Sequence, residues 1–186
     1  MIELQAVFYY VMKDRSVYDE LRREVDQAVE SGKISETPSY SEAIQLPFLK
    51  ATIKEALRLH PGVGFTMPRI VDQNGIELAG MYIPPGWKVG MNAAVVGRDA
   101  GVYGSDADTF RPERWIDRND PLMERCYNLA FGAGTRTCIG KQASLPRCYA
   151  CSIMRPRGIT NMATDCAERD IQDRATIDSQ IRIFLS

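Results

Sequence analysis

The sequence predicts a mainly α-helical fold with a small β-sheet. The first third of the chain repeats apolar residues at helical spacing, which is typical of packed helices. The middle of the chain carries short apolar runs separated by Asn-Gly and Pro-Gly turns, which favour strands. A hydrophobic content of 45% and a charged content of 25% fit a soluble globular protein. At 186 residues, the chain is long enough for one domain with a real core.

Two helices are expected before Gly32. Residues 2–13 leave little polar face, as in a largely buried helix. We expect Ser16 to cap the second helix, with Asp19 three residues later completing a capping box. Apolar residues recur every four positions from residue 17 to residue 29 and give this helix one apolar face. Gly32 is a natural end for it.

A third helix is expected over residues 47–60, ended by Pro61. Glu55 and Arg58 lie three positions apart on this helix, so their side chains share a face and can pair. Taken alone, such a pair is usually an exposed ion pair that contributes little to stability. The pair is therefore informative only in combination with other motifs in the sequence.

The strands are expected in the middle of the chain. Residues 65–72 and 76–78 are predicted to form a hairpin joined through an Asn-Gly turn. Residues 88–91 form a further extended run. From residue 101 to residue 128 the chain is rich in Asp, Arg and Pro, and we expect this stretch to be irregular.

Residues 131–140 read FGAGTRTCIG and place one thiol, Cys138, in a glycine-bent loop. A thiolate is a strong, electron-donating ligand of haem iron. Gly134 and Gly140 let the backbone approach sulfur and porphyrin where a side chain would collide. Backbone N–H groups, and a helix beginning just past Cys138, would favour the thiolate. The alternative for Cys138 is a small buried hydrophobe.

Two further side chains suit such a site. Arg136 can pair with a haem propionate, and Phe131 can keep water off the metal. In this order, the residues of the loop resemble the cysteine-ligand loop of the cytochrome P450 haem-thiolate monooxygenases. The family pattern is Phe, two residues, Gly, one residue, Arg, one residue, Cys, one residue, Gly, and all five fixed positions are filled here.

The resemblance extends to two earlier segments. The helix with Glu55 and Arg58 resembles the family's Glu-x-x-Arg helix, and residues 110–115 resemble its Pro-Glu-Arg-aromatic segment. The resemblance implies that Glu55, Arg58 and Arg114 form a buried charge cluster. Its role would be structural, because removing one partner strands a buried charge. A solvated loop cation is the alternative interpretation of Arg114.

The same resemblance implies that the first strand runs beside the haem edge and the substrate pocket. Arg69 is then a second candidate partner for a propionate, and an exposed strand arginine is an equally good interpretation. Val63, Phe65 and Thr66 would lie where relatives contact their substrates.

The resemblance implies a partial cytochrome P450 fold. Residues 1–141 would be its proximal, cysteine-bearing C-terminal portion, and residues 142–186 an unmatched, irregular tail. The implied cofactor is a b-type haem with Cys138 as axial iron ligand, and the implied reaction inserts one oxygen atom from O2 into a small organic substrate. Electrons would come from an NADPH-dependent reductase. Residues 110–115 are similar in style to fungal members of the family. We find no counterpart of the family's acidic residue and threonine that deliver protons, so no catalytic side chain is assigned.

Composition and charge limit which partners, disulfides and locations are expected for this chain. A formal net charge of −1 gives no reason to expect nucleic acid as a partner. Five unevenly spaced cysteines do not resemble a disulfide framework. The opening residues lack the features of a signal peptide or membrane anchor, and no apolar run reaches the length of a membrane span. The resemblance implies the cytosolic face of the endoplasmic reticulum membrane, whereas this chain, expressed alone without an anchor, is expected to be cytoplasmic.

Two alternatives stay open. The family pattern is lost after Lys141, which leaves a truncated or mis-spliced, non-catalytic fragment with weak or no haem binding. Cys148, Cys151 and Cys166 leave open a thiol-rich zinc or redox module. His60 is the single histidine, which argues against a Ser-His-Asp centre and against histidine-rich metal sites. At the end of a helix, His60 is more simply a partner of the helix dipole.

Overall fold

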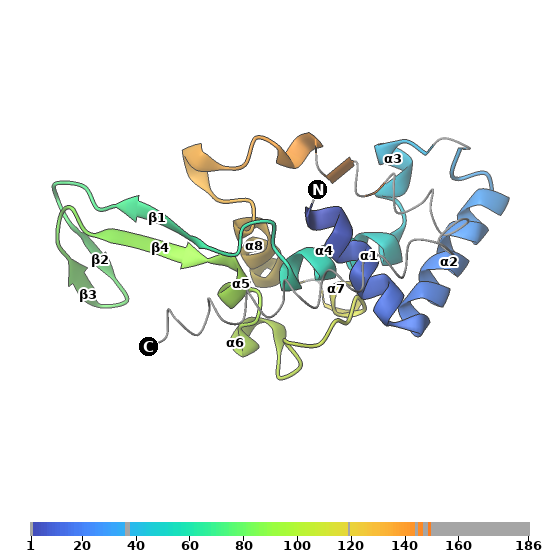
Figure 1. Ribbon diagram of the computed structural model, residues 1–186, viewed down its shortest axis with the longest axis horizontal. Coiled ribbons are helices and arrows are strands. Elements are labelled where there is room, and N and C mark those ends of the chain that lie inside the picture. The colour runs from blue at the N-terminus through green and yellow to red at the C-terminus, as the bar shows by residue number, and fades with distance from the viewer. Residues whose placement is uncertain (1, 36–37, 119, 144, 147–148, 150–186) are drawn as a thin grey trace. The chain divides into compact units, whose positions relative to one another are not determined.

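The computed structural model describes residues 2–35, 38–118, 120–143, 145–146 and 149 (Figure 1). The chain divides into two compact units, a first that contains the described residues up to Ile53 and a second formed by residues 54–141. Helices dominate, and the strands lie between residues 66 and 92, which confirms a mainly α-helical fold with a small β part. Among the described helices, none is both long and apolar enough to cross a lipid bilayer.

The first unit opens with two helices that pack against each other. Helix α1 spans Ile2–Lys13 and helix α2 spans Arg15–Glu30 (Figure 1). The apolar face predicted for α2 is present, because Val17, Leu21 and Val25 are buried. Ala28, rather than Val29, completes this buried face at its C-terminal end.

The predicted cap of α2 is wrong. The N-cap is Asp14, whose Oδ1 accepts hydrogen bonds from the backbone N–H groups of Ser16 at 3.0 Å and Val17 at 3.3 Å. The Ser16 hydroxyl donates to the same oxygen, which lowers the pKa of Asp14. A carboxylate is the stronger acceptor, so the helix begins two residues earlier than predicted. Asp19 instead forms an exposed ion pair with Arg15 at 3.0 Å.

Two more helices follow in the chain. Helix α3 spans Tyr40–Ala43, and its Ser39 cap forms a capping box with Glu42. Helix α4 spans Pro47–Leu59, as predicted to within one residue. Between residues 51 and 59 of α4, only Lys54 is not buried. Such all-round burial marks α4 as a core helix rather than a surface one.

The start of α4 is capped from a distance by Glu24 on α2. The two carboxylate oxygens of Glu24 accept hydrogen bonds from the backbone N–H groups of Phe48 and Leu49, both at 2.8 Å. These amides belong to the first turn, which has no acceptors within its own helix. Burial raises the pKa of Glu24 despite the two hydrogen bonds.

The strands pair differently from the predicted hairpin. Strand β1 (Thr66–Ile70) runs antiparallel to β4 (Lys88–Asn92), and β2 (Ile76–Leu78) pairs with β3 (Met81–Ile83). The predicted turn exists, since the Gly75 N–H donates to the Asp72 carbonyl at 3.2 Å, but it leads into a second hairpin at the end of the first.

The reason for this correction is a shorter connection. Ala79 and Gly80 both have positive φ, at 50° and 77°, and join β2 to β3 through a two-residue turn. Such turns match the twist of the flanking strands. Residues 76–78 therefore pair with their nearest neighbours in sequence, and β1 is left to pair with β4.

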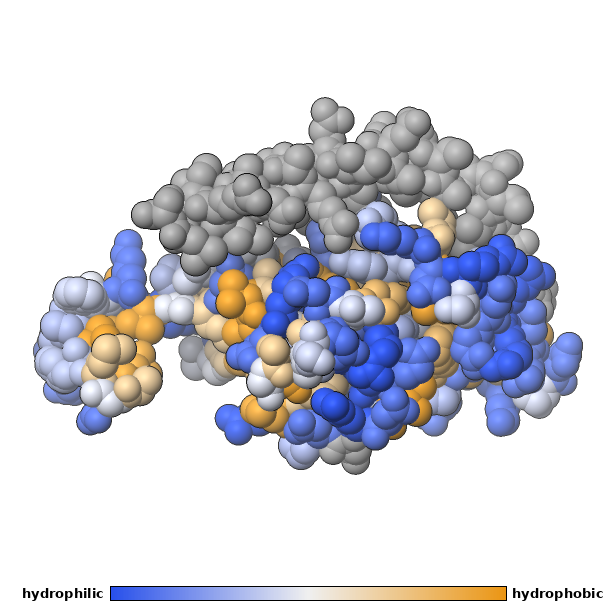
Figure 2. All heavy atoms as spheres, turned by 90° about the horizontal axis from the view of Figure 1, so that it is seen from below, coloured by the Kyte–Doolittle hydropathy of each residue, from blue (hydrophilic) through white to orange (hydrophobic). Residues whose placement is uncertain are grey.

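This strand region exposes large apolar side chains. Ile70, Met81, Tyr82 and Trp87 are each 63% to 70% exposed. Figure 2 shows apolar surface gathered on the same part of the molecule, at the left of the view. Polar side chains do not cover this surface as they cover a typical soluble domain.

The stretch predicted to be irregular contains three helices. These are α6 (Ala100–Tyr103), α7 (Arg114–Asp117) and α8 (Pro121–Leu129), with α5 (Ala93–Val96) just before them. The start signals of α8 are the cap Asp120 and a proline at its first position. Two of the three helices have only four residues, which is too short for a helical pattern to show in the sequence. The many Pro and Asp residues therefore indicated irregular structure instead. Tyr103, Ala107 and Met123 form a small core here.

Replacing Glu24 with alanine tests the distant cap. Glu24→Ala leaves two amides of α4 without their acceptor and is expected to lower the free energy of unfolding by about 1–3 kcal/mol. Urea denaturation followed by circular dichroism measures it. The control is Glu20→Ala, whose ion pair with Arg23 is exposed and should change stability by less than about 0.5 kcal/mol. Equal losses in the two variants would contradict the cap.

Candidate functional site

A fully buried carboxylate, that of Glu55, lies at the centre of the most polar part of the interior. It accepts hydrogen bonds from the side chains of Arg58, Arg114 and Trp115 and from the backbone N–H of Arg111, at 2.8 to 3.0 Å. The structure thus brings together Glu55, Arg58 and Arg114, the three residues of the predicted cluster. A buried charge is tolerable when it is paired and hydrogen-bonded in this way.

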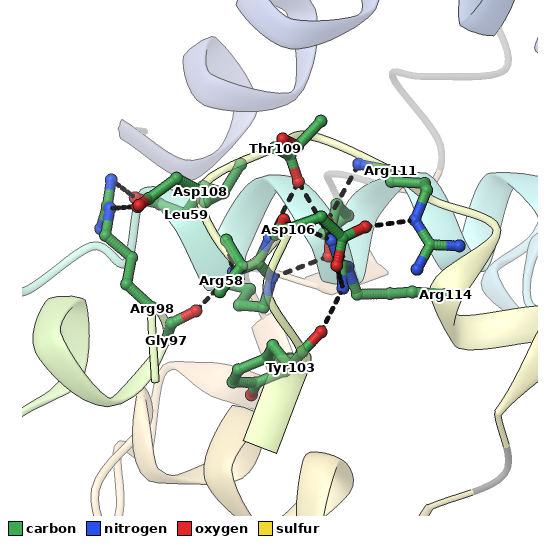
Figure 3. Close-up of polar contacts among 12 residues, drawn as sticks. Arg58, Leu59, Gly97, Arg98, Tyr103, Asp106, Asp108, Thr109, Arg111 and Arg114 are labelled. Carbon is green, nitrogen blue, oxygen red and sulfur yellow. Dashed lines mark hydrogen bonds and ion pairs between the residues drawn. The ribbon is translucent and has the colours of Figure 1, made fainter. Parts of the chain in front are cut away.

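Arg58 ties α4 to the loop that precedes α7. Its Nη1 donates to the carbonyl oxygens of Gly97 and Ala107, and its Nη2 donates to that of Thr109 at 3.2 Å (Figure 3). Its guanidinium also lies 4.8 Å from the centroid of the Tyr103 ring. A Cβ atom at residue 97 would lie 2.4 Å from the Arg58 carbonyl oxygen, so this contact requires a glycine.

Arg114 repeats this arrangement from α7. Its Nη1 donates to the carbonyl oxygen of Tyr103 at 2.7 Å, and its Nη2 donates to that of Asp106 at 2.9 Å (Figure 3). Burial alone would lower the pKa of Arg114, but the carboxylates of Glu55 and Asp106 outweigh burial and raise it. The guanidinium group of Arg114 therefore stays charged.

Asp106 closes the outer side of the cluster. Its Oδ1 accepts from Arg114 at 3.1 Å and its Oδ2 from Arg111 at 2.7 Å. These guanidinium groups, Arg114 first, hold the pKa of Asp106 at about 2. The sequence prediction missed Asp106, Arg111 and Trp115. The last two lie inside the matched segment 110–115, which was a usable signal, whereas Asp106 lies in no motif.

The geometry indicates that this cluster holds segments of the chain together and is not a reactive centre. Each guanidinium is engaged both with Glu55 and with backbone carbonyl groups. The acceptors lie between residues 97 and 109, so the two arginines hold that loop against α4. Strong hydrogen bonds to fixed backbone groups favour rigidity over proton transfer.

The cysteine-bearing loop follows α8 directly. The backbone N–H of Cys138 donates to the carbonyl oxygen of Phe131 at 2.7 Å, which closes the loop at its base. Phe131 itself is buried, while residues 133–139 are all exposed, Ile139 by 97%. Residues 134–136 form a short 3-10 turn, η1 (Gly134–Arg136). Residues 141–143 are helical, so a helix does begin after Cys138.

The glycines of this loop serve different needs. Gly134 has φ of 65° with no atom within 4 Å of a hypothetical Cβ, so its need is conformational. A Cβ at Gly140 would lie 3.5 Å from the Cys138 sulfur, an ordinary contact. The tight position is Gly132, with φ of 76° and the Arg136 carbonyl oxygen 3.1 Å from a Cβ. The sequence prediction did not select Gly132.

The two predicted propionate partners lie on separate elements. Arg136 is exposed in η1, and Arg69 is exposed on β1, where its Nη1 donates to the Pro68 carbonyl oxygen at 3.0 Å. Val63, Phe65 and Thr66 are also exposed, just before and at the start of β1. In the described part of the chain, neither arginine forms an ion pair.

The donor chemistry of the loop fits haem. Cys138 is a free, exposed thiol, and no group of three or more His, Cys, Asp or Glu side chains among the described residues could hold a bare metal ion. A single sulfur suits an iron whose remaining ligands come from a macrocycle. Cys148, Cys151 and Cys166 of the zinc alternative lie outside the described residues. His60 is half-buried at the end of α4, where its backbone N–H donates to the Ala56 carbonyl oxygen at 2.8 Å.

Neutralising the central carboxylate tests the cluster. Glu55→Gln leaves two buried guanidinium groups around an amide and is expected to cost about 3–5 kcal/mol of unfolding free energy. Chemical denaturation measures the loss. Glu113→Gln, an exposed residue at the start of α7, is the matched control and should be nearly neutral. If Glu55→Gln lowers the free energy of unfolding by less than about 1 kcal/mol, the cluster does not have this structural role.

The lowered pKa of Asp106 predicts an acid-sensitive contribution. Its pKa falls from an ordinary 3.8 to about 2, so the folded state favours the ionised form. The stabilisation is present above pH 4 and is lost as the pH falls toward 2. Urea midpoints across this window should therefore fall more steeply for the natural chain than for Asp106→Asn. Asp108→Asn, whose side chain is 85% exposed, should leave the slope unchanged. Parallel profiles for all three would contradict the assignment.

Comparison with known proteins gives the family. The family profile of cytochrome P450 matches residues 2–145. The chain is 79% identical over 149 residues to the cytochrome P450 monooxygenase gsfF of Penicillium aethiopicum, covering 80% of this chain and 30% of that protein. It is 44% identical over 149 residues to the cytochrome P450 monooxygenase ACRTS1 of Alternaria alternata, covering 78% and 39%.

A third relative has a named activity. Pisatin demethylase of Fusarium vanettenii is 39% identical over 142 residues, covering 76% of this chain and 27% of that protein. The chain thus spans between 27% and 39% of the length of these three relatives, all of them fungal. The family profile covers the charge cluster, the cysteine loop and all the strands. This chain belongs to the cytochrome P450 family.

Proposed function

We propose that this chain is the haem-binding, cysteine-bearing portion of a monooxygenase that inserts one oxygen atom from O2 into a small organic substrate. The observation that carries the proposal is the exposed thiol of Cys138, on a loop closed at its base by the Phe131 carbonyl group. In this proposal, residues 1–141 are the cytochrome P450 portion, and residues 142–186 lie outside it.

The residues of the loop would each do one thing. Cys138 would be the ligand of the haem iron, and the backbone around Gly134 and Gly140 would leave room for the macrocycle. Arg136 and Arg69 would pair with propionates, which suits their exposed guanidinium groups. Phe131 would keep water from the sulfur side.

The charge cluster supports the site indirectly. Glu55, Arg58 and Arg114 fasten the segment that leads from the strands to α8 and hence to the loop. Fixing the thiolate in this way removes freedom that a metal would otherwise have to restrict on binding. When bound, haem supplies the activation of dioxygen, with electrons from an NADPH-dependent reductase. No proton-delivering side chain is assigned to the chain.

The proposal also includes a cellular location. Family membership supports the cytosolic face of the endoplasmic reticulum for the complete relatives, where their reductase would meet them. For this chain by itself, we propose binding of haem before any turnover, because the matched segment is only 27% to 39% of the length of these relatives.

A reduced carbon monoxide difference spectrum tests the proposal. The purified chain supplied with haem should show the strongly red-shifted Soret band of thiolate ligation. Cys138→Ala should abolish this band, because it removes the sulfur. Cys126→Ala, at a half-buried free thiol on α8, is the control and should keep the band. Failure of the natural chain to take up haem would instead support a non-catalytic fragment, and an unchanged band in Cys138→Ala would refute the assigned ligand.

A further inference from the structure

Lys54 lies on α4 immediately before Glu55, and its side chain is only 14% exposed. Its ammonium group lies 5.1 Å from the centroid of the Trp115 ring and 5.7 Å from that of the Tyr127 ring. It also forms an ion pair with Glu124. A lysine held between two rings and a carboxylate is desolvated enough for its attraction to the rings to matter.

The two rings belong to a ladder of successive ring contacts, formed by Trp115, Tyr127 and Phe131, that leads toward the cysteine loop. The centroids of Trp115 and Tyr127 are 5.6 Å apart with their planes at 70°, and those of Tyr127 and Phe131 are 6.0 Å apart at 75°. Edge-to-face pairs of this kind have a preferred geometry and resist sliding. Because Glu55 accepts a hydrogen bond from Trp115 Nε1 at 2.8 Å, adjacent residues of α4 hold both the face and the edge of one indole.

The last ring of the ladder belongs to the residue that closes the loop. The Phe131 carbonyl accepts the Cys138 N–H at 2.7 Å. On the other side of the loop, Lys141 Nζ lies 5.0 Å from the Phe131 ring centroid and donates to Asn128 Oδ1 at 2.8 Å. Both ends of the loop therefore meet at Phe131 and the end of α8.

We propose that Lys54 is a positioning residue for Cys138. It holds α8 to α4 through Glu124, Trp115 and Tyr127, and thereby sets the Phe131 carbonyl that receives the Cys138 N–H. Its role as an aid to iron ligation rests on the proposed function. Its mechanical role does not, because that role depends only on contacts among residues 54–141 of the chain itself.

Amide hydrogen exchange on the full chain without haem tests the mechanical role. Lys54→Met keeps the length of the side chain but removes the charge, and should raise the exchange rate of the Cys138 amide about fivefold. Lys50→Met, an exposed lysine one turn earlier on the same helix, is the matched control and should leave that rate unchanged. An unchanged rate in Lys54→Met, or equal increases in both variants, would overturn the proposal.

A general loss of stability is separated from a local effect by two readings. The amide of Leu57, buried on α4 in the same unit as Cys138, reports opening of that whole unit, and its rate should rise less than that of Cys138. Lys54→Arg keeps the cation and its ring contacts, and should restore slow exchange at Cys138. Equal increases at both amides, or no rescue by arginine, would reduce Lys54 to an ordinary stabilising residue and overturn the positioning role.

Haem supplies the second readout. At equal haem content, Lys54→Met should lower the ratio of thiolate-ligated to thiolate-free reduced carbon monoxide complex about fivefold, and Lys50→Met should not. A natural chain without the thiolate band would refute the proposed function while the exchange result still decides the role of Lys54. A natural chain with the band, and an unchanged ratio in Lys54→Met, would refute the link to ligation alone.

Discussion

The buried carboxylate of Glu55 connects parts of the chain that are far apart in sequence, and the second unit is organised around it. Its oxygens engage α4 through Arg58, α7 through Arg114 and Trp115, and the backbone at residue 111. A charge in the interior is costly unless every lone pair is satisfied, so these partners are interdependent. The arginines in turn bind the carbonyl groups of the loop between residues 97 and 109. One carboxylate thus supports a segment that has almost no regular structure of its own.

The sequence predicted the parts of the fold that are set by local pattern or by a spaced motif. The stripe on α2 and the ends of α4 follow from helical periodicity, and the cluster of Glu55, Arg58 and Arg114 was placed by motif resemblance. The cap of α2 was missed because two possible cap residues, Asp14 and Ser16, lie within three positions of each other. The carboxylate of Asp14 accepts the backbone N–H group, and the Ser16 hydroxyl donates to that same carboxylate.

Other misses have different causes. The pairing of β1 with β4 depends on the short Ala79-Gly80 turn, and the pair Ala-Gly is not one of the strong turn formers Asn-Gly and Asp-Gly. Asp106 joins the cluster only because the loop folds back on Arg114, and no periodic pattern marks it. Gly132 looked like one glycine among several until its contact with the Arg136 carbonyl group was visible.

The two-stranded sheets have a further consequence. In the part of the chain that the structure describes, each sheet has only two strands, so every strand is an edge with free backbone hydrogen-bonding groups. Ile70, Tyr82 and Trp87 add exposed apolar surface to those edges. Open edges of this composition favour pairing between molecules, and a concentrated preparation of this chain is therefore expected to form oligomers by strand addition. Dilution, or a charged residue placed on β1, is the physical remedy.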